Sequence, residues 1–253
     1  ALGDYDHVIQ LQPDSIEAYN NRGNVLKELG QLEEAAACYD RAIQLKSGYI
    51  AAYNNRGNAL KDLGKLKEAV VCYNKAIQLK PDYAEVYSNR GLALQQLGQL
   101  VEAIENYDKA IQLKLDFAEA YYNRGSALLE LEQFAESKES TDRAIQLKPY
   151  FAEAYCNLGS ALKELGKLTA AVEQYDRAIQ FKPDYADAYY NRGLAFQKLG
   201  QLTEAIVSYD KAIQFKPDFA EAYSNRGLVL QDLGWLAEAV ESYDKAIQLK
   251  PDY

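Results

Sequence analysis

The sequence predicts an all-α protein built from stacked copies of one helix pair. The pentapeptide Ala-Ile-Gln-Leu-Lys recurs, twice with Phe in place of Leu, and its copies are always separated by a multiple of 34 residues. Such periodicity is typical of repeat proteins whose units stack on one another. Within each period the apolar residues follow the 3.6-residue spacing of amphipathic helices, and Gly and Pro stand at fixed places between the helical stretches.

The composition is that of a globular protein rather than a disordered one. The 253 residues include 28 basic and 37 acidic side chains, for a net charge of −9, and 48% of them are hydrophobic. No apolar stretch approaches the roughly 18 residues of a membrane span, the start shows no secretory signal pattern, and the acidic balance argues against a nucleic-acid partner. The absence of Met, even at residue 1, predicts a processed product or an excised fragment.

Each repeat is predicted to contain helix A, a tight turn, helix B and a second turn. In the first full repeat helix A covers 16–29, Gly30 ends it, and helix B follows from Leu32 to Leu45. Helix B stops at position 32, where five of seven full repeats place Pro. The Asp that usually follows is expected to cap the next helix A. We predict one solenoid over 1–253, with a partial repeat 1–15 and full repeats 16–49, 50–83, 84–117, 118–151, 152–185, 186–219 and 220–253.

A glycine stands inside helix A of every full repeat, at position 8. Mid-helix Gly costs about 1 kcal/mol relative to Ala, so packing must offset it. We expect this Gly to let helix B approach closely, with the small residue at position 20 as its counterpart. The aromatic residues at positions 4 and 24 are expected to fill the space beside that contact.

This pattern resembles the tetratricopeptide repeat family over the whole chain. The family signature has aromatics at positions 4 and 24, Gly at 8 and 15, Ala at 20 and 27, and Pro at 32. Positions 4, 8 and 27 are Tyr, Gly and Ala in all seven full repeats. The resemblance implies a right-handed α-solenoid of antiparallel helix pairs, about seven and a half units long, with helix A lining a concave groove. It also implies a non-enzymatic protein-interaction scaffold that binds extended peptide segments in this groove.

The repeat 118–151 departs most from the pattern, with Glu132 at position 15, Ser137 at 20, Lys138 at 21 and Thr141 at 24. Replacing an aromatic core residue by a small one costs about 2 to 4 kcal/mol. Two interpretations stay open: drift in a redundant array, or a soft joint that alters the pitch or opens under load.

The ends of the array are expected to lack partners. Residues 1–15 form a helix B without its helix A, which leaves Tyr5, Val8 and Ile9 short of contacts, and the last repeat ends at Tyr253 without a polar capping helix. We therefore expect a segment of a longer protein, or ends that pack against another copy. Two alternatives to the peptide scaffold follow: a module that self-assembles end to end, and a targeting domain of a larger enzyme.

Positions 2, 6, 9 and 13 share the side of helix A opposite its apolar stripe, and position 6 is Asn in every full repeat. Asn offers a donor and an acceptor, which match the N–H and C=O of a peptide backbone. The ladder is similar to that in the superhelical domain of O-linked N-acetylglucosamine transferases, where groove Asn residues hold peptide backbone. Asn bridging from one repeat to the next is the alternative. The ladder comprises Asn21, Asn55, Asn89, Asn123, Asn157, Asn191 and Asn225.

Acidic residues at position 2 lie on the same side, and position 5 flanks it. We predict that this groove prefers neutral or basic extended segments, although acids at a helix N-terminus also interact favourably with the helix dipole. The Lys and Arg clamp by which chaperone-binding members of the family hold a C-terminal carboxylate is absent. Besides the ladder, the predicted groove residues are Glu85, Glu119, Glu153, Asp187, Tyr122 and Tyr190.

Arg occupies position 7 in six of the seven full repeats, in the middle of the apolar stripe. A buried charge is costly without a partner, and position 25 of helix B is usually Asp. We hypothesise an Arg–Asp ladder that ties helix A to a neighbouring helix B. Pairing by repeat leaves Arg56 with Asn74 and Leu158 with Asp176 as mismatches.

Little in the chain supports metal, cofactor or nucleophile chemistry. His7 is the one His, and no Cys/His cluster has metal spacing. Cys38 and Cys72 share position 23 of successive repeats, too far apart for a disulfide. With Cys156 they are expected to be free thiols in a reducing compartment, which predicts a cytoplasmic protein. Trp235 is expected to be a partly exposed turn residue.

Overall fold

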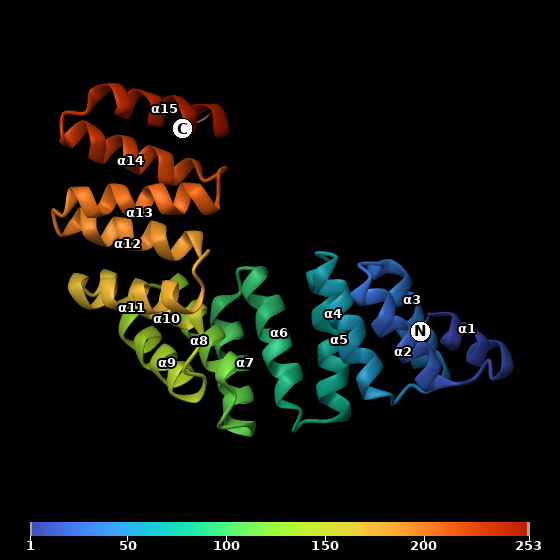
Figure 1. The fold of residues 1–253 in the computed structure, drawn as a ribbon. Helices are drawn as coiled ribbons and strands as arrows, with labels where there is room; N and C mark the ends of the chain where they lie inside the picture. The colour runs from blue at the N-terminus through green and yellow to red at the C-terminus, as the bar shows by residue number, and fades with distance from the viewer. Residues whose placement is uncertain (1, 252–253) are drawn as a thin grey trace. The chain divides into compact units, whose positions relative to one another are not determined.

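The computed structural model describes residues 2–251 and confirms the all-α prediction: this stretch holds fifteen helices and no strand (Figure 1). Partial repeat 1–15 supplies α1, a helix B. Each full repeat supplies a helix A of 13 residues and a helix B of 14. The bounds are α1 Leu2–Leu11, α2 Ile16–Glu28, α3 Leu32–Leu45, α4 Ile50–Asp62, α5 Leu66–Leu79, α6 Ala84–Gln96, α7 Leu100–Leu113, α8 Ala118–Glu130, α9 Phe134–Leu147, α10 Ala152–Glu164, α11 Leu168–Phe181, α12 Ala186–Lys198, α13 Leu202–Phe215, α14 Ala220–Asp232 and α15 Leu236–Leu249.

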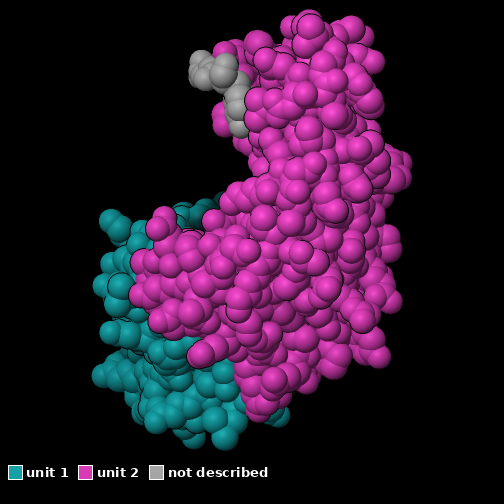
Figure 2. All heavy atoms as spheres, turned by 90° about the vertical axis from the view of Figure 1, so that its left-hand side faces the viewer, with its two compact units in different colours: residues 1–127 teal, residues 128–253 magenta. Residues whose placement is uncertain are grey.

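The chain divides into two compact units, residues 1–127 and 128–253 (Figure 2). The division falls inside α8, which is helix A of the departing repeat 118–151. Within each unit, helices pack against their neighbours in the chain, and successive helices A also touch, as α2 touches α4 and α10 touches α12. The arrangement within each unit is that of an α-solenoid.

The turn from helix A to helix B depends on a left-handed residue at position 15. In the first full repeat Gly30 has φ 76°. Its N–H donates to the Lys27 carbonyl at 3.0 Å, and the N–H of Gln31 donates to the Leu26 carbonyl at 2.9 Å. These two bonds form a Schellman motif, which satisfies carbonyls that the helix end would leave unpaired. The predicted role of Gly at position 15 is confirmed.

The turn from helix B back to helix A differs from the sequence prediction. Helix A begins at position 1, so its N-cap is the residue at position 34, usually Tyr or Phe, and that residue makes no side-chain cap bond. The expected capping role of the Asp at position 33 is therefore wrong. The aromatic at position 34 is held instead by packing: Phe219 is buried, and the Lys216 Nζ lies 4.3 Å from its ring centroid.

The closest contact between helices A and B joins Gly at position 8 to the Tyr ring at position 24. A Cβ built on Gly57 would lie 2.5 Å from Cε1 of Tyr73, a ring that is fully buried. The same clash, at 2.5 to 2.7 Å, occurs at Gly23, Gly91, Gly159, Gly193 and Gly227. The expected counterpart at position 20 is thus corrected: Ala69 is buried, but the glycine makes room for the aromatic ring.

Each of the six described tyrosines at position 24 of a full repeat hydrogen-bonds its hydroxyl to one residue of its own helix A. Where position 9 is Asn or Ser, that residue is the partner: Asn24 for Tyr39, Asn58 for Tyr73 and Ser160 for Tyr175, at 2.9, 2.8 and 3.3 Å. Where position 9 is Leu, a Gln at position 12 accepts instead: Gln95 from Tyr107, Gln197 from Tyr209 and Gln231 from Tyr243, at 2.8, 2.9 and 3.0 Å.

The arginines at position 7 form the hypothesised ladder. Five of the six reach an Asp at position 25 of the preceding helix B: Arg22–Asp6 and Arg56–Asp40 at 2.7 Å, and Arg124–Asp108, Arg192–Asp176 and Arg226–Asp210 at 2.6 Å. Several also contact position 23 of their own helix B: Cys38, Cys72, Asn106, Ser208 and Ser242. One guanidinium thus ties three helices together.

Because the partner comes from the preceding repeat, the mismatches predicted from the sequence were wrong. Arg90 meets Asn74, whose Oδ1 accepts at 2.7 Å. Leu158, 6% exposed, packs in the core instead of pairing. The aspartate at the corresponding place, Asp142, pairs at 2.6 Å with Lys138 one turn earlier. The unusual Lys138 of the departing repeat therefore supplies the cation that Leu158 does not.

The departing repeat keeps the turn geometry without glycine. Glu132 has φ 58°, the one non-Gly residue with positive φ in the described part of the chain, and Gln133 N–H still donates to the Leu128 carbonyl at 2.9 Å. Ser137 and Thr141 are fully buried, and the Thr141 hydroxyl donates to the Ser137 carbonyl at 2.5 Å. The hydroxyl of Thr141, which stands where other repeats have a tyrosine ring, is therefore satisfied within α9.

The terminal helices are the least covered. Helix α1 contains no buried residue, and Val8 is exposed. On α15, Val240 and Ile247 are 57% and 50% exposed, whereas the equivalent Ile206 and Ile213 of α13 are buried and half-buried. Tyr253 lies outside the described residues.

Replacing Gly57 by Ala should lower the free energy of unfolding by about 1 to 3 kcal/mol, because the new Cβ overlaps the buried Tyr73 ring. Chemical denaturation measures the change. Gly3→Ala is the matched control, since Gly3 lies in helix α1 with no atom within 4 Å of its would-be Cβ. An unchanged midpoint for Gly57→Ala would contradict the close contact.

Replacing Glu132 by Gly should raise the free energy of unfolding by about 1 kcal/mol, because glycine adopts positive φ without strain. The converse change, Gly98→Glu at φ 76°, should destabilise the chain by a similar amount. Thermal unfolding of both variants tests this pair, and equal melting temperatures would refute the strain at Glu132.

Alkaline pH should destabilise the protein. Burial raises the pKa of Tyr39, Tyr73, Tyr175 and Tyr209 above the usual value. Above about pH 10 the unfolded chain loses these protons and the folded chain keeps them, so stability falls as pH rises. Unfolding curves at increasing pH, with tyrosinate absorbance as the second signal, measure this fall. Titration of every tyrosine before unfolding would contradict it.

Candidate functional site

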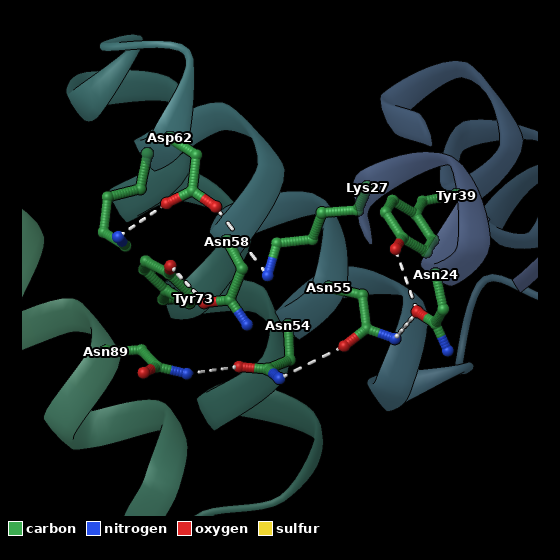
Figure 3. Close-up of polar contacts among 10 residues, drawn as sticks. Asn24, Lys27, Tyr39, Asn54, Asn55, Asn58, Asp62, Tyr73 and Asn89 are labelled. Atoms are coloured by element: carbon green, nitrogen blue, oxygen red, sulfur yellow. Dashed lines mark hydrogen bonds and ion pairs between the residues drawn. The ribbon is translucent and has the colours of Figure 1, made fainter. Parts of the chain in front are cut away.

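The candidate site is the side of helix A that carries positions 2, 6, 9 and 13. All seven Asn residues at position 6 are half-buried there, each on its own helix A. Because one Asn recurs per repeat, neighbouring rungs come from successive helices A. Figure 3 shows this face across α2, α4 and α6 within the unit 1–127.

The position-6 amides bond from one repeat to the next. Asn55 Nδ2 donates to Oδ1 of Asn20 and of Asn24, both at 3.1 Å. Asn89 Nδ2 donates to Asn54 Oδ1 at 3.0 Å (Figure 3). The accepting residue is thus at position 5 of the preceding repeat. Asn55 also donates to the residue at position 9 of that repeat. These Asn residues therefore bridge one repeat to the next, which the sequence analysis left open as the alternative to peptide binding.

The rungs within residues 128–253 use different acceptors. Asn225 Nδ2 donates to the Tyr190 hydroxyl at 2.9 Å, and Asn191 Nδ2 lies 3.9 Å from Cys156 Sγ. Asn157 Nδ2 is buried without a hydrogen bond in the described residues. Burial raises the pKa of the Cys156 thiol to about 12, so this sulfur stays protonated.

Four of the ladder's amide donors, those of Asn55, Asn89, Asn191 and Asn225, are used by the preceding repeat, but some of the ladder's acceptors remain. The Oδ1 atoms of Asn89, Asn191 and Asn225 accept no hydrogen bond within residues 2–251. An amide oxygen on a half-buried side chain accepts from any N–H that reaches it. Position 6 therefore offers a ligand carbonyl oxygens more than amide hydrogens.

The acids at position 2 lie where helix A begins, beside the lysine that ends helix B of the same repeat. Glu85 pairs with Lys114 at 3.5 Å and Glu153 with Lys182 at 3.2 Å. Glu119 and Asp187 are exposed on α8 and α12. Part of the acidic character expected of this face is therefore balanced by lysines.

The two predicted groove tyrosines are half-buried at position 5. The Tyr190 ring lies 4.7 Å from that of Phe219 and 6.0 Å from that of Tyr209, so its body belongs to the packing between repeats. Its hydroxyl accepts the hydrogen bond that Asn225 Nδ2 donates. Tyr122 is its counterpart on α8.

Residues at positions 9 and 12 belong to the same face and were not among the predicted site residues. Lys27 Nζ and Lys61 Nζ lie 3.7 and 2.7 Å from the Asp62 carboxylate. Figure 3 draws Lys27 and Asp62 together with Asn24 and Asn58 of α2 and α4. The sequence held a signal for them: Lys stands at position 12 only where position 9 is Asn or Ser, and Gln only where it is Leu.

Cys38, Cys72 and Cys156 are free thiols, as predicted, and all three are buried, which the sequence did not predict. Across residues 2–251, no three His, Cys, Asp or Glu side chains gather as a metal site would require. No helix in that stretch has the length and apolar character needed to cross a membrane.

Several solved structures are similar to this chain. MamA is 31% identical over 64% of this chain and 95% of its own, with a TM-score of 0.59. YrrB, described as a TPR protein with an unusual peptide-binding site, is 26% identical over 74% of this chain and 97% of its own, with a TM-score of 0.60. A tetratricopeptide repeat protein from Parabacteroides merdae, 19% identical, shares the fold over 93% of both chains with a TM-score of 0.74. Curated protein sequences yield no match.

Family models match most of the chain. The model described as TPR repeat matches residues 23–64, 57–98, 96–132, 159–200 and 198–234, and others described as Tetratricopeptide repeat match 4–37, 118–151 and 220–253. They cover the departing repeat as well as the regular ones. The chain belongs to the tetratricopeptide repeat family.

Proposed function

We propose that the protein is a non-enzymatic cytoplasmic scaffold that binds extended peptide segments along helix A of its repeats. Tetratricopeptide repeat proteins are generally non-catalytic scaffolds for protein interaction, and membership of this family supports the coarser half of the proposal. The finer half names the groove residues: the seven Asn at position 6, Glu85, Glu119, Glu153, Asp187, Tyr122 and Tyr190.

One observation carries the finer half. The same half-buried amide recurs on every helix A, and at Asn89, Asn191 and Asn225 its oxygen is left without a donor in the described residues. Asn191 and Asn225 stand one repeat apart within residues 128–253. Acceptors at such a regular spacing suit a ligand with regularly spaced N–H groups, and an extended peptide backbone is such a ligand. The preference for neutral or basic segments stays a prediction, because lysines balance part of the acid at position 2.

A second candidate function is self-association through the ends. The observation that favours it is the exposure of Val240 and Ile247 on α15, at positions that are covered in internal repeats. Sedimentation over a range of concentrations separates the two functions. A monomer whose state does not change with Val240→Lys would remove the second one.

Two substitutions of Asn89 distinguish its structural role between repeats from its proposed role in peptide binding. Asn89→Ala and Asn89→Asp both lose the donor to Asn54 and should each cost about 1 kcal/mol of stability. Asp keeps acceptor oxygens, so only Asn89→Ala should weaken peptide binding, by several-fold. Affinities of peptides selected by proteome-wide display measure the difference. If both variants bind as the parent does, position 6 is structural only.

A further inference from the structure

The repeat 152–185 lacks the guanidinium that the other full repeats place between their helices. Leu158 stands at position 7, where the other six have Arg. In five of those six the arginine donates to position 23 of its own helix B, as Arg192 does to Ser208 at 3.1 Å. In two of them it also lies over the Tyr ring at position 4, and Arg192 Cζ is 5.2 Å from the centroid of the Tyr189 ring.

The residues that would meet such a guanidinium in this repeat have no cation. Tyr155 at position 4 and Gln174 at position 23 are both half-buried. Within residues 2–251 no cation lies over the Tyr155 ring, and the Gln174 side chain makes no hydrogen bond. Asp142, the carboxylate that an arginine at position 7 would reach in the preceding helix B, is paired with Lys138 at 2.6 Å. The ring and the amide are therefore present without the group that normally lies between them.

A cleft opens at this place on the molecule. Its volume is about 490 Å³. The corresponding cleft of the repeat 220–253, which is also lined by positions 4, 22 and 23, retains Arg226 at position 7 and measures about 280 Å³. The cleft is thus larger where the arginine is missing. Its lining residues are Tyr155 of α10 and Glu173, Gln174, Asp176, Arg177 and Gln180 of α11.

The lining also provides carboxylates for an incoming cation. Glu173 is exposed. Asp176 is 53% exposed, and although its Oδ1 accepts from Arg192 at 2.6 Å, its Oδ2 accepts no hydrogen bond within residues 2–251. The cation of the lining, Arg177, donates to Gln180 Oε1 on its own helix at 3.1 Å. A cleft with an aromatic ring, an amide oxygen and carboxylates suits a planar cation.

Exposed aromatic rings continue the surface beside the cleft. The centroid of the Phe181 ring lies 5.4 Å from that of Tyr155 and 5.4 Å from that of Tyr150. Tyr150 is 77% exposed and stands at position 33, where five of the seven full repeats have Asp. Tyr and Arg are enriched where proteins contact one another. The exposed ring therefore favours a protein over a free small molecule as the occupant of the cleft.

We propose that this cleft binds an arginine side chain of a partner protein, in the place that position 7 gives to the chain's own arginine in the other repeats. The partner's guanidinium lies over Tyr155, donates to Gln174 Oε1 and pairs with Glu173. Residues flanking that arginine cover Tyr150. No residue of the cleft stands at positions 2, 6, 9 or 13 of helix A, so this site is separate from the proposed peptide groove.

Filling the cleft from within the chain should prevent binding. Leu158→Arg supplies the residue that the other repeats have, and Leu158→Met is its control, because it keeps an apolar side chain of similar volume. Glu173→Gln removes the carboxylate at position 22. Glu105→Gln is the matched control, since it makes the same change at position 22 of a repeat that retains its arginine. Thermal unfolding establishes that each variant is folded.

The repeat 84–117 allows the converse experiment. It already has Tyr at position 4 and Glu at position 22, so Arg90→Leu with Asn106→Gln completes the set of residues that forms the cleft. Because Arg90 meets Asn74 rather than an aspartate, the change leaves no carboxylate of the preceding helix unpaired. This variant should bind one additional equivalent of an arginine peptide.

Three labelled Gly/Ser peptides serve as probes, each with a single central Arg, Lys or citrulline, the neutral isostere of arginine. Fluorescence anisotropy should show the Arg peptide binding at least about fivefold more tightly than the other two. Leu158→Arg and Glu173→Gln should each weaken it by at least about fivefold, and the two controls should bind as the parent does. In nuclear magnetic resonance spectra of the parent, the side-chain amide signal of Gln174 should shift as the Arg peptide is added.

Two results would overturn the proposal. One is an Arg peptide that binds the parent and Leu158→Arg equally while the Gln174 amide signal stays fixed, in which case the proposed function of the groove still stands. The other is equal affinity for the Arg and Lys peptides, or for the Arg and citrulline peptides, because neither result is compatible with recognition of a guanidinium.

Discussion

The contact between Gly at position 8 and the Tyr ring at position 24 sets the separation of helices A and B in every regular repeat. The ring leaves no space for a Cβ on the facing helix, as at Gly57 and Tyr73. An aromatic residue of this size buries a large apolar area, which offsets the cost of glycine inside a helix. The ring also carries its hydroxyl through the core to helix A, so the packing contact fixes polar groups on the opposite face.

The arginine at position 7 acts between repeats as the tyrosine acts within them. A single guanidinium meets an aspartate of the preceding helix B and a small polar residue or Cys of its own helix B. Each half-exposed ion pair contributes modestly, about 0 to 1 kcal/mol. The guanidinium matters more for geometry, because this planar group can donate hydrogen bonds to two different helices at once. The pair Leu158 and Lys138 shows how one repeat does without it.

Helix existence, order and bounds followed from the sequence because periodicity, Gly and Pro act locally. The Schellman turn at Gly30 is such a local case. Sequence reasoning failed where a residue's role depends on a neighbour in space. The Asp at position 33 has the chemistry of a cap, yet packing of the aromatic at position 34 moves the helix start. The partner of Arg56 could not be assigned because the repeat register does not say which neighbouring helix B lies nearer.

The tyrosine hydroxyl at position 24 needs one hydrogen-bond acceptor. Either position 9 or position 12 of helix A supplies it. The two pairs found here, Asn or Ser with Lys and Leu with Gln, meet this requirement equally while presenting different chemistry outward. A single point mutation at either place breaks the hydrogen bond or duplicates the acceptor, whereas the paired change conserves it. The binding face of such an array is thus free to diversify by coupled double changes, repeat by repeat, under a core that stays constant.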